Sequence, residues 1–546
     1  MNTHVIVWTK TCLSLALCLS AIVMNAVPAY PGWQTKSQPD GSTITARLVG
    51  DEYAYYWETE DGKVAVERAD GLFVKTDEAV PTPEQFAARR AQARAAMRAM
   101  QKAPISRAPK VAEVPQFPPR GLVILVNFAD IQMDEAHTRE VFDDMCNSRN
   151  CTTNTYKGIN YGSAAQYYED QSFGAYRPQF DVFGPVTLDH PESYYGEQVV
   201  VNGTTFVDGY AVDMVLEAAK AVEELGCDFT QYDADGDDYV DLVFYVFAGY
   251  GQHSGAGSDM IWPHMNYASD LMAYGLTHGN TGFCFSDDCF NPPMFDGKYL
   301  DMYACTSEMY INNLFTGIGT ICHEFSHALG LPDLYDILNG SNPHTPKTYD
   351  LMDIGSYNGE SHCPPNYSPW ERAFLGWTEP VNPGNTFTVD TLHAHDSGRY
   401  NTYQINQSGE LQGATEPGVC YYLENRRKTG WDTYIPKEGV LVWRTDYDAE
   451  LWSKNKVNLL SESSETNRCI IAAQGCSEWT DVPGRPVTDI HEQDGMIIFR
   501  YMDDAADVED IRYQNSDIRC QKVIRNRQLY ILRDDNTYSV IGIAIR

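Results

Sequence analysis

Three residues in one short segment have the types and the spacing of a zinc site. His323 and His327 are four positions apart, so on a helix their side chains leave the same face and can bind a single zinc ion. Glu324 follows the first histidine, where a carboxylate can accept a proton from a water molecule activated by the metal. Gly330 and Asp333 come next, at the spacing at which the extended motif places a third ligand after a glycine turn. The segment therefore predicts a hydrolytic zinc centre with His323, His327 and Asp333 as ligands.

A helix must hold the two histidines, and the sequence predicts one. Apolar residues recur every three or four positions, at Ile318, Cys322, Phe325 and Leu329. The histidines fall off this stripe, on a face left free for metal. Gly330 can adopt the left-handed conformation that ends a helix, and Pro332 prevents its continuation. The chain can then bend back and carry Asp333 toward the ion.

A second segment lies downstream, where residues 349–357 read Tyr-Asp-Leu-Met-Asp-Ile-Gly-Ser-Tyr. It resembles the methionine turn that lies beneath the metal in the metzincin clan of zinc proteases. Taken alone, Leu351 and Met352 would be two core residues near a turn. Beside the zinc motif, we interpret Met352 as the hydrophobic floor of the site and not as a ligand.

The chain resembles secreted metalloproteases of the immune inhibitor A type. The resemblance rests on the segment from His323 to Asp336 and on motifs at 121–128, 170–174, 233–251, 261–264, 351–352, 375–377, 421–425 and 439–443. These motifs span most of residues 30–450. The third metzincin ligand is usually a histidine, so Asp333 carries that assignment here, with Asp336 as the alternative. Arg444 stands where a histidine is expected, and no role is transferred to it.

Both the ligand charge and the resemblance lead to the same mechanism. Two neutral imidazoles and one carboxylate leave zinc with net positive charge and an open position, so its water yields hydroxide near neutral pH and Glu324 takes the proton. Tyr357 and Tyr335 are the candidates for stabilising the oxyanion, with Tyr357 preferred. A thermolysin-like plan would instead take Glu360 or Glu371 as the third ligand. His264 is expected to be a core or cleft-wall residue.

Composition and charge limit the number of domains and the kinds of binding partner. The 546 residues carry a net charge of −35 and 43% hydrophobic residues, enough for two to four domains. Residues 30–116 hold 12 basic and 12 acidic side chains, so the acidic excess lies in residues 117–546. An acidic surface opposes binding to nucleic acid and to anionic membranes. We expect the substrates to be proteins or peptides and the protein to be a monomer. The alternative function is that of a surface binding protein whose zinc site is vestigial.

The first residues have the features of a signal peptide. Lys10 precedes an apolar run from 13 to 23, and Val27-Pro28-Ala29 supplies small residues for cleavage. The run is too short to span a bilayer, and no later stretch is long enough. Residues 1–29 are therefore expected to be a Sec signal peptide, and the protein to be secreted or associated with the cell surface.

Cysteine usage agrees with export. Of 14 cysteines, Cys12 and Cys18 leave with the signal peptide, and the even number that remains favours disulfides. Cys146 with Cys151, and Cys284 with Cys289, are the short-range candidates. Residues 30–116 contain no cysteine, so a thiolate in that segment cannot keep the enzyme latent.

The chain divides into four parts. Residues 30–118 are interpreted as a propeptide, with hairpins at Asp-Gly turns, a helix from Thr82 to about Lys102, and a basic connector cut between Arg89 and Pro119. A permanent N-terminal domain is the alternative. Residues 119–385 form the predicted metzincin-like catalytic domain. Its expected elements are a buried strand near 121, a helix at 207–225, a buried strand at 242–248 and an edge strand at 300–306 bordering the cleft. Residues 386–546 are predicted to be β-rich, with a β-sandwich and a possible sorting tail, so that the fold class is α+β.

An acidic loop is a candidate calcium site. Carboxylates stand at relative positions 1, 3, 5 and 9 in Asp233, Asp235, Asp237 and Asp241, and the backbone carbonyl of Tyr239 is available between them. Position 12 is Phe244 and not glutamate, so the loop is not a complete EF-hand. We expect Ca²⁺ here in a structural role, besides Zn²⁺ in the catalytic one.

Overall fold

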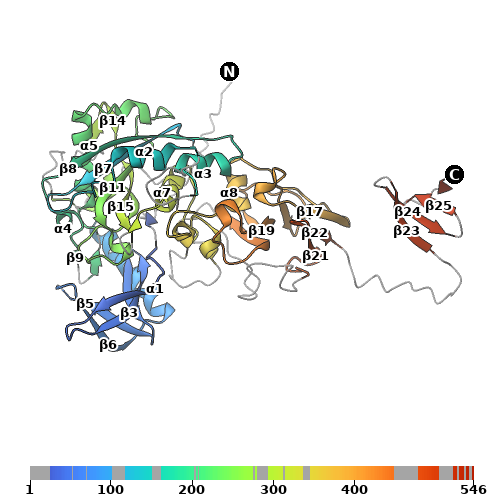
Figure 1. Cartoon of the computed structure of the whole chain (residues 1–546), viewed down its shortest axis with the longest axis horizontal. Coiled ribbons are helices and arrows are strands. Elements are labelled where there is room, and N and C mark those ends of the chain that lie inside the picture. The colour runs from blue at the N-terminus through green and yellow to red at the C-terminus, as the bar shows by residue number, and fades with distance from the viewer. Residues whose placement is uncertain are drawn as a thin grey trace, which may run out of the picture.

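A computed structural model describes most of the chain. The described residues are 25–26, 28–51, 53–68, 70–100, 117–149, 161–201, 204–206, 208–274, 277–278, 293–310, 314–335, 345–447 and 477–502, with strands between 520 and 545. Helices and sheets both contribute to it, as an α+β chain requires (Figure 1).

The N-terminal part is an antiparallel meander followed by a helix. Its strands are β2 (Gln34–Ser37), β3 (Thr43–Asp51), β4 (Ala54–Thr59), β5 (Lys63–Glu67) and β6 (Phe73–Ala79), hydrogen-bonded in chain order. The three Asp-Gly turns are present, with their glycines at positive φ. Helix α1 (Pro83–Met100) follows, and its buried Arg90 pairs with Asp51 at the end of β3. The predicted hairpins and helix are confirmed.

A central sheet organises the middle of the chain. Its order is β1 (Asn25–Ala26), β12 (His264–Tyr267), β15 (Met302–Tyr310), β11 (Val243–Tyr250), β7 (Arg120–Asn127) and β8 (Gln179–Thr187), with β16 (Leu314–Phe315) beside β15. The strands from β15 to β8 are parallel, whereas β12 and β1 are antiparallel to their neighbours. Residues 122–126 of β7 are all fully buried, because a parallel sheet is covered on both faces.

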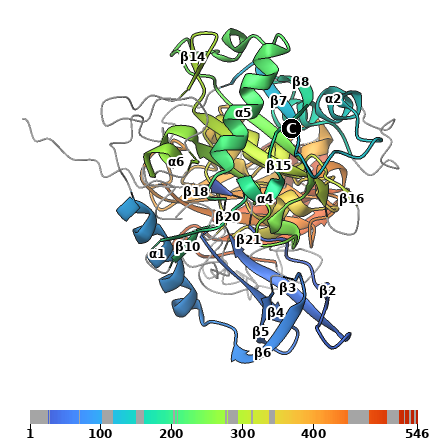
Figure 2. The same cartoon turned by 90° about the vertical axis from the view of Figure 1, so that its left-hand side faces the viewer.

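Helices cover the two faces of this sheet (Figures 1 and 2). On one face, α5 (Ala211–Glu224) packs against Leu122 and Ile124 of β7. On the other, α7 (Gly319–Ala328) and α3 (Ala164–Gln171) pack against Val123 and Leu125. The other short elements are α2 (Arg139–Asn147), α4 (Glu192–Tyr195), β9 (Val199–Val201), β10 (Thr204–Phe206), α6 (Ala268–Tyr274), β13 (Met294–Phe295), β14 (Lys298–Tyr299) and α8 (Pro369–Phe374).

Three of the four predicted elements of this part are in place. The buried strand near 121 is β7, the helix at 207–225 is α5, and the strand at 242–248 is β11. The prediction of an edge strand at 300–306 is wrong. These residues form β15, which lies inside the sheet because β12 pairs with its outer side. The strand that borders the cleft is therefore β12, whose four residues are too short to show a period of two.

The C-terminal part contains two antiparallel sheets with a shared core. One consists of β17 (Thr388–Leu392), β22 (Met496–Tyr501) and β21 (Val487–Gln493), and the other of β18 (Tyr403–Asn406), β19 (Gly418–Arg426) and β20 (Gly439–Tyr447). Leu423 and Val442 face this core, whereas Tyr422 and Trp443 join the core that contains α7. The second sheet thus belongs to both cores. A further sheet comprises β23 (Cys520–Arg525), β24 (Gln528–Arg533), β25 (Asn536–Ser539) and β26 (Ala544–Ile545).

Cysteines and hydropathy bear on the predictions about export. Across the described ranges there is no disulfide, and Cys227, Cys305, Cys363 and Cys420 are buried thiols. Cys151, Cys284 and Cys289 lie outside the described residues, so the proposed short-range pairs stay predictions. No helix in the described part of the chain is long and apolar enough to cross a membrane.

Candidate metal centre

Helix α7 and the turn after it position the candidate ligands. The apolar stripe packs into the core as predicted, and Ile318, Cys322, Phe325 and Leu329 are all buried. Gly330 has φ 93° and its N–H donates to the carbonyl of His327 at 2.9 Å, which ends the helix in the left-handed conformation. The N–H of Leu334 then donates to the carbonyl of Met352 at 2.7 Å. The chain after the helix is thereby fixed against the predicted methionine turn.

The structure brings His323, His327 and Asp333 together. One ligand atom from each lies within 4.8 Å of the other two. The Oδ1 of Asp333 is 3.1 Å from Nε2 of His323 and 3.5 Å from Nε2 of His327. All three side chains are buried. The second oxygen of Asp333 has no hydrogen-bond partner among the described residues, so a further acceptor faces the same point.

Backbone carbonyls orient both imidazoles. Nδ1 of His323 is 2.8 Å from the carbonyl of Leu351, and Nδ1 of His327 is 2.8 Å from the carbonyl of Leu331. Since a carbonyl can only accept, each Nδ1 carries the proton in the neutral ring. In the neutral form of each ring, Nε2 carries the lone pair that a metal ion could accept. Two imidazole nitrogens and one carboxylate fit a zinc ion that keeps an open position.

Glu324 lies beside this cluster, and no hydrogen bond within the described residues uses its carboxylate. It is fully buried, its Oε2 is 3.9 Å from Nε2 of His327, and neither of its oxygens has a hydrogen-bond partner among the described residues. Burial raises the pKa of Glu324 to about 8, although the charge of His323 opposes this. Burial lowers the pKa of His327 to about 4. Burial alone would lower the pKa of His323, but the hydrogen bond to Asp333, the charges of Glu324 and Asp333 and the carbonyl of Leu351 together raise it to about 9.

Residues 350–357 form the wall behind the cluster. Met352 is fully buried in the core that contains α7, and its N–H donates to Asp350 at 2.8 Å. Tyr357 ends a short 3-10 helix, η5 (Ile354–Tyr357). Burial raises the pKa of the Tyr357 phenol and the charge of Glu324 adds to this, so the phenol stays protonated as a hydrogen-bond donor. Tyr335, the other candidate, lines a cavity together with Asp353 and Ile354, and the choice between the two tyrosines stays a prediction.

The alternative ligands lie elsewhere. The Oε2 of Glu371 accepts from the backbone N–H and hydroxyl of Ser368 in a helix cap, and Glu360 is exposed. Asp336 lies outside the described residues. His264 is a buried strand residue, with Nε2 2.8 Å from the Tyr303 hydroxyl, as expected for a core histidine. Arg444 lies 3.7 Å from Asp446 on β20.

Part of the N-terminal segment occupies the cleft beside the cluster. Residues of β1 pair with β12, and the Tyr357 hydroxyl then donates to the carbonyl of Pro28. The N–H of Tyr30 donates to the carbonyl of His253 at 3.0 Å. A cavity of about 340 Å³ remains here, and its lining includes Pro28, Ala29 and Pro31, part of β3, and Asp353 and Ile354. Sequence periodicity gave no sign of this arrangement, because it depends on contacts more than 200 residues apart.

Comparison with known proteins addresses the same region. Residues 120–378 match the model of the immune inhibitor A peptidase M6 catalytic domain. The matched segment, called the M6 segment below, covers just under half of the chain, and over that part the chain is similar to M6 peptidases. The cluster of His323, His327 and Asp333 lies inside the M6 segment. The boundaries of the catalytic domain, 119 and 385, stay a prediction.

Two relatives illustrate the extent of the similarity. The chain is 27% identical to immune inhibitor A of Bacillus thuringiensis subsp. alesti over 243 residues, 41% of this chain and 33% of the relative. It is 24% identical to the pre-pro-metalloprotease PrtV of Vibrio cholerae serotype O1 (strain M66-2) over 286 residues, 46% of this chain and 29% of the relative. The matched regions thus span about a third of the curated relatives.

The acidic loop of the M6 segment is folded around its carboxylates. Ligand atoms of Asp233, Asp235 and Asp237 lie within 4.8 Å of one another. Asp241 accepts from the N–H of Ala234 at 3.0 Å, and burial raises its pKa to about 6, assisted by the neighbouring carboxylates. The ammonium of Lys298 is 2.8 Å from Asp233, a cation that the sequence pattern did not indicate. Tyr239 follows in the same loop.

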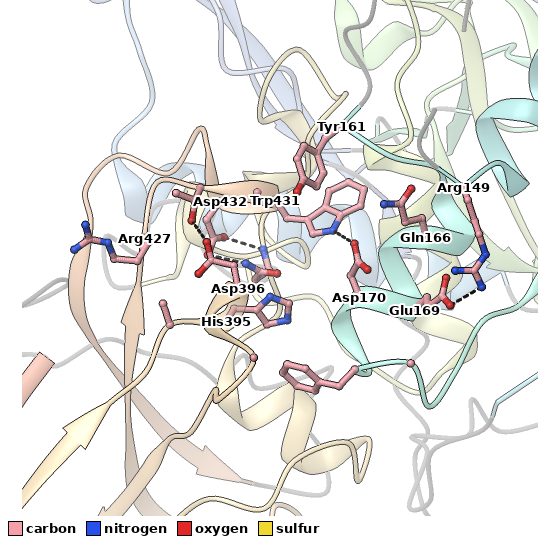
Figure 3. A pocket seen from close by; sticks show the side chains of 17 residues that line it. Arg149, Tyr161, Gln166, Glu169, Asp170, His395, Asp396, Arg427, Trp431 and Asp432 are labelled. Atoms are coloured by element: carbon pink, nitrogen blue, oxygen red, sulfur yellow. Dashed lines mark hydrogen bonds and ion pairs between the residues drawn. The ribbon is translucent and has the colours of Figure 1, made fainter. Parts of the chain in front are cut away.

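A second cavity lies where the M6 segment meets the C-terminal sheets, and sequence reasoning missed it. It holds about 540 Å³ between α3 and the loops near 395 and 430 (Figure 3). The indole N–H of Trp431 donates to Asp170 on α3 at 2.9 Å, and its ring packs edge-on against Tyr167. The hydroxyl of Tyr168, the next residue, donates to the carbonyl of Cys322 on α7 at 2.7 Å. Helix α3 therefore links this cavity to α7, which carries the candidate ligands His323 and His327.

Proposed function

We propose that the chain is a secreted zinc-dependent endopeptidase made as a zymogen. The observation that carries the proposal is the convergence of His323, His327 and Asp333 on one point, with the unpaired carboxylate of Glu324 beside it. Two imidazoles and one carboxylate that leave a fourth position open are typical of a catalytic zinc site, so zinc is the expected ion. Proteins or peptides are the expected substrates.

The chemistry divides between the ion and the protein. A bound zinc ion supplies Lewis acidity, which makes a water molecule nucleophilic near neutral pH and polarises the scissile carbonyl. Glu324 accepts the proton of that water and returns it to the leaving amine. The phenol of Tyr357 donates a hydrogen bond to the oxygen on which negative charge develops. The carbonyls of Leu351 and Leu331 hold the imidazoles in the tautomer that this requires.

The zymogen proposal is supported by the position of the N-terminal segment. Tyr30, the first residue of the proposed propeptide, packs against Tyr357, and its N–H donates to the carbonyl of His253. The five-stranded meander that follows Tyr30 packs beside the M6 segment, and PrtV is itself named a pre-pro-metalloprotease. We propose that residues 1–29 act as a signal peptide, that residues 30–118 act as a propeptide, and that the C-terminal sheets form a β-sandwich module.

Removing the metal tests the proposal. Incubation with 1,10-phenanthroline should lower the hydrolysis of casein by at least about 10²-fold, because no side chain replaces the Lewis acid. Added zinc should restore the activity, and the non-chelating 1,7-isomer should have no effect. Metal analysis of the native protein should find one zinc per catalytic centre. Zinc bound without any peptide hydrolysis would instead support the alternative of a surface binding protein.

We also propose that Ca²⁺ stabilises the loop of Asp233, Asp235, Asp237, Tyr239 and Asp241. With zinc held saturating, a calcium chelator should lower the Tm by several degrees, since an ion at about 100 times its Kd contributes about 2.7 kcal/mol. Asp235→Asn should lower the Tm similarly and remove the response to the chelator. An unchanged Tm would show that Lys298 alone balances these carboxylates, and calcium would then have no role here.

A further inference from the structure

The ring of Tyr30 sits in a pocket of aromatic side chains next to the metal cluster. Its centroid is 5.4 Å from that of Tyr310 and 5.9 Å from that of Tyr357, with interplanar angles of 81° and 76°. Edge-to-face contacts at this spacing are the favourable arrangement for aromatic pairs. Two such contacts at once indicate a pocket shaped for a ring. We call the pocket formed by Tyr310, Tyr357, Leu314 and Ile354 the aromatic seat.

The aromatic seat is apolar and uncharged. Tyr310 and Tyr357 are buried, and they stack on each other at 6.1 Å. His253 stacks on Tyr357 from behind, and burial lowers the pKa of His253 to about 3, so this ring is neutral. Burial raises the pKa of the Tyr30 phenol, and the negative charge of Glu360 contributes to the shift. A carboxylate near the opening disfavours acidic side chains.

The segment that carries Tyr30 follows the path available to a substrate. Before the proposed signal peptide is removed, residues 25 and 26 pair with β12 in antiparallel register, which is how extended peptides dock on a sheet edge. Two residues later the carbonyl of Pro28 accepts from Tyr357, the proposed oxyanion donor. Tyr30 is the second residue after that carbonyl. Its N–H is held by His253 and its ring by the aromatic seat.

We infer that the aromatic seat is a substrate subsite, and that it binds an aromatic side chain on the C-terminal side of the scissile bond. The inference rests on the proposed peptidase function, because it assigns the substrate class of the same site. It makes Tyr310 and Tyr357 specificity-determining residues. Tyr30 is then a built-in occupant that the substrate must displace.

A peptide library tests the inference with the activated protein, from which the proposed propeptide has been removed. Among the cleaved peptides, Tyr, Phe or Trp should exceed Ala by about tenfold at one position within two residues after the cleaved bond. Tenfold corresponds to about 1.4 kcal/mol. Asp and Glu should be depleted there. Efficient cleavage without any aromatic preference at these positions would overturn the inference and leave the proposed peptidase function standing.

Two variants distinguish a specific loss of the aromatic preference from a general loss of folding or activity. Tyr310→Ala should reduce the aromatic preference to less than about threefold, with the loss appearing mainly in KM and not in kcat. Phe387→Ala is the matched control, because this aromatic residue is exposed and lies outside the cleft. It should keep the tenfold preference. An unchanged preference in Tyr310→Ala would contradict the inference.

Tyr30 itself provides a test that needs no turnover. Tyr30→Phe keeps the ring and should keep the Tm and the latency of the full-length protein, whereas Tyr30→Ala should lower both. Since Tyr30 follows the expected cleavage after residue 29, it remains in the exported chain. If no peptide is cleaved by any form, the peptidase proposal fails, and this comparison still decides whether the seat selects an aromatic ring. Equal Tm values for all three forms would overturn the aromatic seat.

Discussion

Replacing Glu324 with glutamine is expected to lower kcat/KM for peptide hydrolysis by at least about 10³-fold while one metal ion stays bound per chain. Glutamine keeps the shape of the side chain but cannot accept a proton from water, and general base catalysis contributes about 10²- to 10⁴-fold. The ligands are untouched, because His323, His327 and Asp333 contact one another independently of Glu324. Steady-state kinetics and metal analysis on the same preparation check both parts.

Glu360→Gln is the matched control for this variant. It is the same chemical change on an exposed residue of the segment behind the cluster, at a position that a thermolysin-like plan would make a ligand. It should keep full activity and full metal content. Loss of the metal in Glu360→Gln would indicate that Glu360, and not Asp333, is the third ligand. Peptidase activity in Glu324→Gln would refute the role of Glu324 as the general base.

The second large effect is expected at Arg426, whose guanidinium is buried. It lies 3.0 Å from Glu424 and 2.5 Å from Asp432, and it donates to the carbonyls of Tyr349 and Asn366 at 3.1 and 3.2 Å. Arg426→Ala leaves two buried carboxylates without their cation, which costs about 3–5 kcal/mol. That is a large fraction of the stability of an ordinary domain. Urea unfolding followed by tryptophan fluorescence measures the loss.

Arg500→Ala serves as the comparison for Arg426. Arg500 is also a strand arginine with a carboxylate partner, Asp489 at 3.0 Å, but about half of each side chain is exposed. Exposed pairs of this kind contribute less than about 1 kcal/mol. The midpoint of unfolding should therefore hardly move. If both arginine variants shift the midpoint equally, burial of Arg426 is not the cause of its effect.

The zinc motif could be predicted because its information is local. The spacing of His323 and His327, the glycine that ends the helix and the apolar stripe all lie within one helix and its turn, and period and capping rules describe such segments well. The same applies to the Asp-Gly hairpins and to α5. In each case the residues that decide the structure are neighbours in the chain.

The parts that were missed depend on distant pairing. The role of β12 as the edge strand could not be seen, because its four residues show no period and the neighbouring β15 looked like an edge only by its place in the sequence. The seating of Tyr30 joins residues more than 300 positions apart. In the sequence, Arg426 likewise looks like an ordinary strand arginine. Only the structure shows that partners from three other segments surround it.

The shared sheet of β18, β19 and β20 has a practical consequence for dissecting the protein. Tyr422 and Trp443 are fully buried in the core that supports α7, although they follow the boundary predicted at residue 385. A fragment truncated there would expose this apolar surface to water and invite aggregation. Expression of the peptidase unit should therefore extend through β20, so that the metal-binding helix keeps its complete hydrophobic support.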